Sequence, residues 1–339
     1  MALQLGVCRP ARTIHDMAEW GRLAEDIGFA LAATGDSQTM WMDPYIALSQ
    51  IAAVTTEVKV GPFVTVPRTR HPSVAACSIG TLQKLSAGRA YYAIGPGDSA
   101  IYAINEPRVK MAEFEEYALA VRALTRGEEV THRNRTFRIH WDIDPVPLWM
   151  AGDGPRTLEL AGRIADGVVV GNGATVELVA FAREHIAKGA AQAGRSIDDL
   201  EIWYLVPTHM AASRAAGIDE LRFYLASYAK VRFRYDMESK GAVIAPELGE
   251  RIRAFLAEYR SENQFRVDAA DTNALLDKYG LTEWLASQRL ITGSVDEVLA
   301  GLRPLYEAGA TNIVMPQMLP DVLASTAALQ PVVEATRAW

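Results

Sequence analysis

Cysteine is scarce in this sequence, and long apolar segments are missing from it. The cysteines are Cys8 and Cys77, too few for a disulfide framework or a four-thiolate metal site. No run of about 18 apolar residues occurs, which excludes a membrane-spanning helix. No basic segment precedes an apolar stretch at the N-terminus, so we expect no signal peptide. These absences predict a globular protein of the cytoplasm, a reducing compartment, with no membrane partner.

Motifs for metal binding and for covalent catalysis are missing as well. The six histidines include no pair at i, i+4 and no adjacent cysteine, so we expect no bound metal. There is no Gly-x-Ser-x-Gly nucleophile elbow, and residues 95–99 do not complete a dinucleotide fingerprint. This inventory favours an enzyme whose reactivity comes from a bound organic cofactor.

A basic excess is absent too. The chain has 34 Lys and Arg against 41 Asp and Glu, a net charge of −7. Without a basic tract, nucleic acid is excluded as the main partner. Hydrophobic residues make up 50% and charged residues 22% of the 339 positions, which excludes intrinsic disorder. The length fits one α/β barrel of about 250 residues with insertions.

Short β-branched runs alternate with longer amphipathic segments along the chain. Helical segments are recognised by apolar residues at spacings of three and four. The expected strands are residues 3–8, 29–34, 58–66, 90–94, 147–151, 167–170, 201–209 and 312–315. The expected helices are residues 14–27, 44–56, 72–85, 107–124, 155–164, 176–193 and 294–308. Such alternation calls for a parallel sheet, and eight strands close a (β/α)8 barrel.

Local signals refine this pattern. Gly28 stands where a helix would end, and Ser294 with Glu297 forms a capping box at a helix start. Gly61 and Pro62 interrupt the third strand and predict irregular backbone there.

Residues 210–293 exceed the length of a single crossover connection. They contain three further helical segments, 221–235, 246–259 and 274–288. The predicted fold class is therefore α/β, a (β/α)8 TIM barrel with a helical insertion between strand seven and helix eight. We expect one domain over residues 1–339, with the insertion covering the barrel mouth and selecting the substrate.

The loops that follow the strands are the places where a barrel carries its chemistry. Polar and glycine-rich loops follow the second, fourth, fifth and sixth strands, at residues 34–41, 95–99, 152–157 and 171–175. Glycines before a helix N-terminus allow a phosphate to approach the backbone N–H groups. The alternative is that such loops need glycine and cap residues for purely structural reasons.

Three segments resemble a known family: residues 43–99, 154–170 and 293–314. The first includes the sequences TRHP at 69–72 and SAGR at 86–89. They are similar to the luciferase-like superfamily of flavin-dependent oxidoreductases, the bacterial luciferase-like monooxygenases. The branch most similar is that of F420-dependent methylenetetrahydromethanopterin reductase. The resemblance implies a barrel that binds FMN or coenzyme F420 at its carboxyl-terminal face.

The resemblance also implies site residues. Phe63-Val64 falls where the family often has a non-proline cis peptide behind the ring system, and Asp36 and Trp41 fall beside the reactive ring. Ser37 replaces the catalytic histidine of a related sugar-phosphate dehydrogenase, and Phe63 replaces a small residue. The implied cofactor-binding residues are Cys8, Asp36, Phe63, Val64, Thr65, Gly97, Asp98, Ser99, Gly152, Asp153, Gly154, Pro155, Arg156, Thr157, Gly171, Asn172 and Gly173.

Candidates for catalysis are Asp36, Ser37, Trp41 and His209, and Gln317 also follows a strand end. Cys8, Trp41 and His209 each have a structural alternative, because buried side chains mostly serve packing. Histidine would be a natural proton donor or acceptor near neutral pH.

Three functional hypotheses remain open at this point. The first is a monooxygenase that depends on reduced FMN supplied by a separate flavin reductase. The reduced FMN would react with O2 to give a peroxyflavin that oxygenates a small organic substrate. The second is an F420-dependent reductase or dehydrogenase that transfers hydride without O2. For that cofactor's acidic tail, Arg68, Arg70 and Arg156 would supply positive charge, unless they are ordinary surface charges. The third is a non-catalytic flavin-binding protein.

The C-terminal residues 320–339 carry an apolar stripe. It can pack either on the barrel itself or on another subunit. The family resemblance favours a homodimer or homotetramer.

Overall fold

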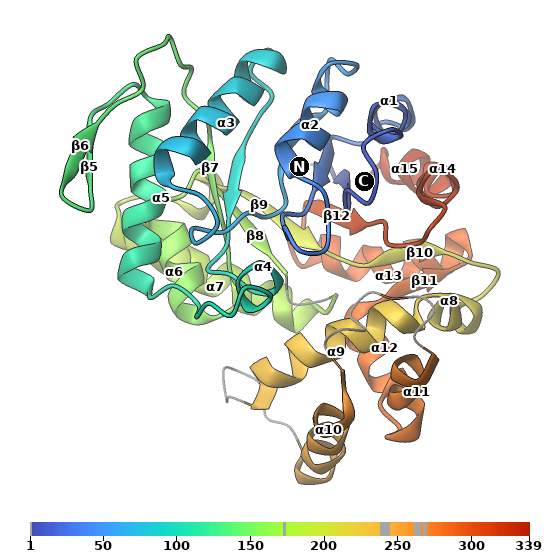
Figure 1. Cartoon of the computed structure of the whole chain (residues 1–339). Coiled ribbons are helices and arrows are strands. Elements are labelled where there is room, and N and C mark those ends of the chain that lie inside the picture. Colours follow the sequence, from blue (N-terminus) through green and yellow to red (C-terminus); the bar gives the residue numbers. More distant parts are fainter. Residues whose placement is uncertain (1, 172–173, 238–244, 261–265, 267–269) are drawn as a thin grey trace.

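A parallel eight-stranded barrel forms the centre of the molecule in the computed structural model, which describes residues 2–171, 174–237, 245–260, 266 and 270–339 (Figure 1). Its strands are β1 Gln4–Arg9, β2 Leu31–Thr34, β3 Lys59–Pro62, β4 Tyr92–Ile94, β7 Leu148–Ala151, β8 Gly167–Val170, β9 Glu201–Leu205 and β12 Asn312–Pro316. They are ordered β3-β2-β1-β12-β9-β8-β7-β4. Parallel bridges from Val60 to Ala90 and from Thr65 to Ile94 join the two edges. The predicted (β/α)8 barrel is thus confirmed.

Helices surround the barrel on its outside (Figure 1). They are α1 Met17–Ile27, α2 Pro44–Ala52, α3 Pro72–Leu85, α4 Ser99–Tyr102, α5 Met111–Thr125, α6 Pro155–Ile164, α7 Val176–Gln192, α13 Val295–Glu307, α14 Val322–Ala327 and α15 Gln330–Thr336. Two predicted boundaries are confirmed in detail: α1 ends at Gly28 with φ 101°, and α13 begins at the Ser294–Glu297 capping box. A short helix Ile197–Asp199 and a hairpin of β5 Val130–His132 and β6 Arg135–Phe137 were not predicted.

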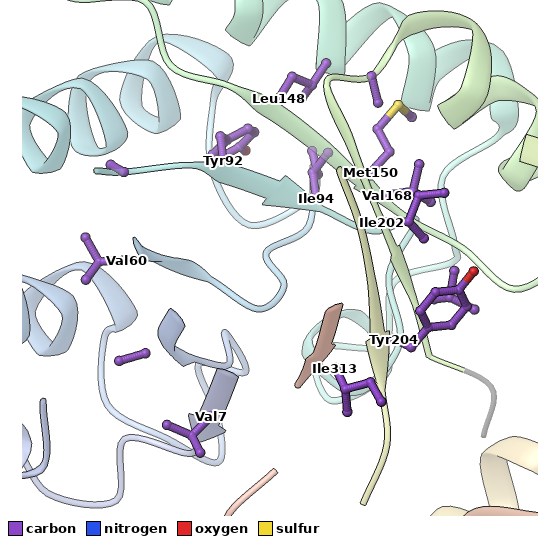
Figure 2. Packing of buried hydrophobic residues seen from close by; sticks show 14 of the residues in the cluster. Val7, Val60, Tyr92, Ile94, Leu148, Met150, Val168, Ile202, Tyr204 and Ile313 are labelled. Carbon is purple, nitrogen blue, oxygen red and sulfur yellow. The ribbon is translucent and has the colours of Figure 1, made fainter. Parts of the chain in front are cut away.

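Alternation along the strands divides the core in two. Val7, Val60, Tyr92 and Ile94 belong to the large cluster between the barrel and its helices, and Figure 2 shows these and other strand residues of that cluster. The side chains of the opposite strand face, Tyr91, Trp149 and Trp203 among them, fill the barrel interior. The Tyr91 and Trp149 rings stack with centroids 3.9 Å apart. The barrel is therefore a filled core, and any ligand site lies at its end.

The insertion consists of helices α8 Arg214–Glu220, α9 Arg222–Met237, α10 Pro246–Glu258, α11 Ala270–Lys278 and α12 Thr282–Arg289. It has a hydrophobic cluster of its own, which includes Phe223, Phe255 and Leu285, together with Met318 from the segment after β12. In Figure 1 its helices gather on one side of the barrel. In the order of strand–helix units, α13 is the helix between the barrel strands β9 and β12. Helices α14 and α15 follow β12 and supply the helical part of the eighth unit.

Two expected elements of this region are divided in the structure. The strand expected at 201–209 stops at Leu205, and its continuation, β10 Thr208–Met210, pairs instead with β11 Ile291–Gly293. Pro207 between them has no N–H with which to continue the barrel ladder. The helix expected at 274–288 is divided at Gly280, whose φ of +61° ends α11 before α12 begins.

The C-terminal stripe packs against the chain's own barrel, because Val322, Leu329, Val332 and Val333 are buried in the main cluster. Among the helices that the structure describes, none combines the length and the apolar character needed to cross a membrane.

Candidate functional site

The loops after the first four barrel strands are tied to one another at the carboxyl end of the barrel. Met42 donates from its backbone N–H to the carbonyl of Ala11, at 2.9 Å, which joins the loops after β1 and β2. The Ser37 hydroxyl donates to the Ser99 hydroxyl at 3.1 Å and so joins the loops after β2 and β4. Several residues predicted from separate segments are therefore brought together here.

Asp36 is the most constrained carboxylate of this group. Its side chain is fully buried, and its Oδ2 accepts hydrogen bonds from the Thr65 hydroxyl at 2.6 Å and from Nη1 of Arg70. Nη2 of Arg70 donates to Asp43 at 2.9 Å. The other carboxylate oxygen of Asp36, Oδ1, is buried and has no donor among the described residues. A buried acceptor without a donor is costly unless a ligand supplies one.

Arg70 is held in its charged form by this arrangement. Burial alone lowers the pKa of the guanidinium, but the charge of Asp36 and the neighbouring Tyr45 and Asp43 outweigh it, and the pKa of Arg70 is raised. The guanidinium lies 5.1 Å from the centre of the Tyr45 ring, and the Tyr117 hydroxyl donates to the Arg70 carbonyl at 2.8 Å. These contacts hold the Arg70 guanidinium and the Arg70 backbone in place beside Asp36.

The three arginines expected near the site differ in their surroundings. Arg70 pairs with Asp36 and Asp43, and Arg68 pairs with Glu113 at 3.1 Å. The charges of these two are compensated within the protein. The Arg156 side chain is exposed, and no carboxylate of the described residues pairs with it.

Trp41 is half-buried and closes over Gly35. A Cβ at position 35 would lie 2.6 Å from the Trp41 ring, so only glycine allows this approach. Ser37 is buried beside it, with 1% of its surface exposed. Trp41 also borders a cleft of about 290 Å³.

The irregular backbone predicted after Gly61-Pro62 is present. The peptide bond between Phe63 and Val64 is cis, as the resemblance implied. Both side chains pack against the cluster inside the barrel, which contains Cys8. Burial raises the pKa of the Cys8 thiol to about 12, so the thiol remains protonated at neutral pH; a place for Cys8 beside a cofactor stays a prediction.

The loops after β7 and β8 are joined through Gly171. Its N–H donates to Oδ1 of Asp153 at 2.7 Å. Its carbonyl accepts from the Tyr228 hydroxyl at 2.6 Å and from Nη1 of Arg289 at 3.0 Å. The helices α9 and α12 of the insertion are therefore latched onto a predicted cofactor loop. Asn172 and Gly173, predicted for the same loop, lie outside the described residues.

The remaining predicted loop residues hold local structure. Gly97 has φ +105°, and its carbonyl accepts from Nε of Arg108 at 2.9 Å. Asp98 and Ser99 begin the short helix α4. Gly154 precedes α6, Pro155 is the first residue of that helix, and no side chain caps it. Thr157 packs against Gly152, where a Cβ would lie 2.4 Å from the threonine methyl group.

His209 lies apart from this group. It sits on β10, outside the barrel sheet, and its Nε2 is 2.7 Å from Oε2 of Glu220 on α8. Gln317 follows β12 and is buried, with its N–H donating to the Cys8 carbonyl at 2.7 Å. A catalytic role for either residue stays a prediction.

Sequence reasoning did not single out Tyr228 and Arg289. Arg289 is 1% exposed, and its guanidinium lies 4.4 Å from the centre of the Tyr228 ring. Tyr228 belongs to the segment 221–235, which the sequence identified only as helical, and Arg289 directly follows the expected helix 274–288. No local motif distinguishes a buried arginine at the end of such a helix from an exposed one.

Comparison with known families and structures agrees with the barrel fold. A model of the luciferase-like monooxygenase family matches residues 3–312. The chain is 27% identical, over 90% of its length and 91% of the relative's, to 5,10-methylenetetrahydromethanopterin reductase of Methanolobus tindarius. It is 31% identical, over 61% of its length and 68% of the relative's, to an F420-dependent glucose-6-phosphate dehydrogenase of Beutenbergia cavernae.

Among solved structures, the coenzyme F420-dependent tetrahydromethanopterin reductase of Methanopyrus kandleri is similar with a TM-score of 0.77 and 23% identity, over 99% of both chains. The long-chain alkane monooxygenase LadA has a TM-score of 0.70 and 15% identity, over 99% of this chain and 91% of that one. At these identities the structures show a shared fold and leave the chemistry open.

Proposed function

Because the chain belongs to the luciferase-like monooxygenase family, we propose that it is a coenzyme F420-dependent oxidoreductase that transfers hydride to or from a small organic substrate. The support is the likeness, over nine-tenths of the chain, to a methylenetetrahydromethanopterin reductase, together with the F420-dependent dehydrogenase. This reverses the order of the two enzyme hypotheses that the sequence left open. The monooxygenases among the similar structures share the fold at 15% identity and do not carry the same weight.

The observation that carries this proposal within the structure is the free oxygen of Asp36. Oδ1 is a buried acceptor without a donor among the described residues, and it lies where parallel barrel strands end. An N–H or O–H of a bound cofactor or substrate would satisfy it. The residues present therefore fit a bound ring system that reacts beside a carboxylate.

Three groups of residues would hold such a cofactor. Phe63 and Val64 offer an apolar wall above the barrel interior, and the hydroxyls of Ser37 and Ser99 offer donors and acceptors. The N-terminus of α6, which follows the loop after β7 and has no side-chain cap, offers backbone N–H groups to a phosphate. These features suit the phosphate and polyol chain that FMN and F420 share, so they support a flavin-type cofactor without choosing between the two.

When bound, F420 supplies a ring carbon that accepts or gives up hydride, and O2 is not required for that chemistry. Oxidising a substrate C–H beside an O–H also requires an acceptor for the hydroxyl proton, and reduction requires a donor. Asp36 is the group we assign to hold that proton, because Thr65 and Arg70 both donate to Oδ2 and leave Oδ1 without a donor among the described residues. Helix α9, latched to Gly171 through Tyr228, would exclude water from this end of the barrel.

A turnover screen tests the proposal. The purified protein is incubated, under nitrogen and in air, with oxidised F420 and a panel of small alcohols, or with reduced F420 and the corresponding carbonyl compounds and methylene-bridged pterins. A substrate-dependent change in deazaflavin absorbance, equal in the presence and absence of air, is expected. Substrate oxidation that requires reduced FMN and consumes O2 would establish the monooxygenase instead.

A further inference from the structure

Arg12 lies between two clefts at the carboxyl end of the barrel. A cleft of about 290 Å³ is lined by Arg12, Gln38 and Trp41, with other residues of the loops after β1 and β2. A second cleft, of about 190 Å³, is lined by Arg12, Arg9 and Gln317 among others. Arg12 therefore borders both clefts. The larger cleft is also bordered by Trp41, which lies next to the proposed reaction site.

The charges of the two arginines are compensated differently. Nη1 of Arg9 lies 3.1 Å from Oδ2 of Asp16, and its guanidinium lies 5.7 Å from the centre of the Trp20 ring. Arg12 has no carboxylate of the described residues within ion-pair distance. Its pKa is lowered, first by partial burial and then by the nearby charge of Arg9. Arg12 is therefore an exposed cation that borders two clefts without a compensating carboxylate among the described residues.

The backbone holds Arg12 in place without using its side chain. Its own N–H donates to the Pro10 carbonyl at 3.0 Å, and the neighbouring Ala11 carbonyl accepts from Met42 at 2.9 Å. The loop after β1 is therefore fixed to the loop that carries Trp41. The Arg12 side chain itself is exposed and borders both clefts.

We propose that Arg12 forms a subsite for a carboxylate or phosphate group at the edge of the hydride-transfer site. A guanidinium offers two parallel N–H donors that match either anion, and an anion would also relieve the repulsion between Arg12 and Arg9. The inference rests on the proposed function for its biological meaning. The anionic group belongs either to the substrate or to the acidic tail of F420, and the two are separated by experiment.

The first experiment tests the subsite without any cofactor. Inorganic phosphate is titrated calorimetrically into the wild-type protein, Arg12→Gln, Arg12→Lys and Arg126→Gln at low ionic strength. Arg126 is an exposed arginine at the end of α5, and it borders neither of the two clefts. We expect Arg12→Gln to bind phosphate about tenfold more weakly, Arg12→Lys to be intermediate, and Arg126→Gln to match the wild type. Equal binding by Arg12→Gln and wild type, or no binding by either, overturns the subsite.

The second experiment identifies the source of the anion. Wild type and Arg12→Gln are titrated with F420 and with its deazaflavin core that lacks the phosphate and acidic tail, by deazaflavin fluorescence. If the tail occupies the subsite, Arg12→Gln weakens F420 binding about tenfold and leaves core binding unchanged. If the substrate occupies it, both titrations are unchanged while phosphate binding is lost. A wild-type protein that binds phosphate but not F420 contradicts the proposed function and leaves the subsite standing.

Discussion

Thr65 donates a hydrogen bond of 2.6 Å from its hydroxyl to Oδ2 of Asp36, and so links the segment after β3 to the segment after β2. With Arg70 on the same oxygen, the carboxylate has one occupied and one unoccupied face. The orientation of Asp36 is therefore set by its neighbours before any ligand binds. The proposed chemistry depends on that orientation, and the variants below test it from several sides.

Asp36→Asn should lower turnover by about 10²-fold or more, since an amide cannot exchange the proton that a carboxylate can. Asp43→Asn is the matched control, because Asp43 also pairs with Arg70 but lies at the start of α2. Asparagine caps a helix as well as aspartate does, so this control should keep its activity. Steady-state rates with F420 measure both. Equal losses in the two variants would mean that Asp36 acts only through Arg70.

Thr65→Val should reduce kcat more than it weakens cofactor binding, because it removes the donor that orients Asp36 and keeps the side-chain shape. Thr65→Ser retains the hydroxyl and should restore most of the rate. Rates and F420 dissociation constants are measured for both variants. A valine variant with normal kcat would show that the hydrogen bond has no part in positioning Asp36.

Arg70→Gln should lower the free energy of unfolding by about 3 kcal/mol, since it leaves the fully buried Asp36 without its cation. Arg68→Gln should cost less than about 1 kcal/mol, because the Arg68–Glu113 pair is partly exposed. Urea unfolding of the two variants gives the comparison. Similar values for both would contradict the importance of the buried pair.

Tyr228→Phe should weaken cofactor binding about fivefold, in line with the loss of about 1 kcal/mol for one hydrogen bond to the Gly171 carbonyl. Tyr279→Phe provides the control, since that hydroxyl bonds to Glu258 within the insertion and not to the barrel. Fluorescence titration with F420 compares them. An unchanged affinity in Tyr228→Phe would show that the latch between α9 and the loop after β8 does not support the cofactor.

Cys8 predicts a loss of stability in alkali. Its pKa is raised by burial from 9.0 to about 12, so the unfolded chain gives up this proton first. Its stabilising contribution is complete below about pH 9 and is lost as the pH rises, by about 1.4 kcal/mol per pH unit. Urea unfolding at about pH 8 and about pH 10 should therefore show a larger fall in the free energy of unfolding for the wild type than for Cys8→Ala. An equal fall in the free energy of unfolding for the two proteins would show that the Cys8 thiol is not shielded from water in the folded state.

The regular parts of the barrel could be predicted from sequence because they rest on local patterns. The helix Pro72–Leu85 and the strand Gly167–Val170 have the predicted bounds, since proline, glycine and apolar spacing mark them directly. The division of the strand at 201–209 could not be foreseen, because β10 forms only by pairing with β11, some eighty residues away. Pairings of that kind leave little trace in local sequence.

The candidate site also contains some residues that the sequence could identify and others that it could not. Asp36, Ser37 and Ser99 come from loops that glycine and polar residues mark, and the structure brings them together. Arg289 lies 118 residues from Gly171, and their contact depends on how the insertion packs on the barrel. His209 was predicted from its place at the end of a long strand, but that strand ends before it. Burial and long-range contacts decide these cases, and neither is encoded in a short motif.

Equilibrium titration of the purified protein with F420 and FMN in air and under nitrogen, and with reduced FMN under nitrogen, tests the proposed function most directly. We expect F420 to bind in the micromolar range or tighter, at least about tenfold more tightly than FMN in either redox state, and with the same affinity with and without O2. Preferential binding of reduced FMN, with a substrate oxygenated when O2 is then admitted, would contradict the proposal and establish the monooxygenase.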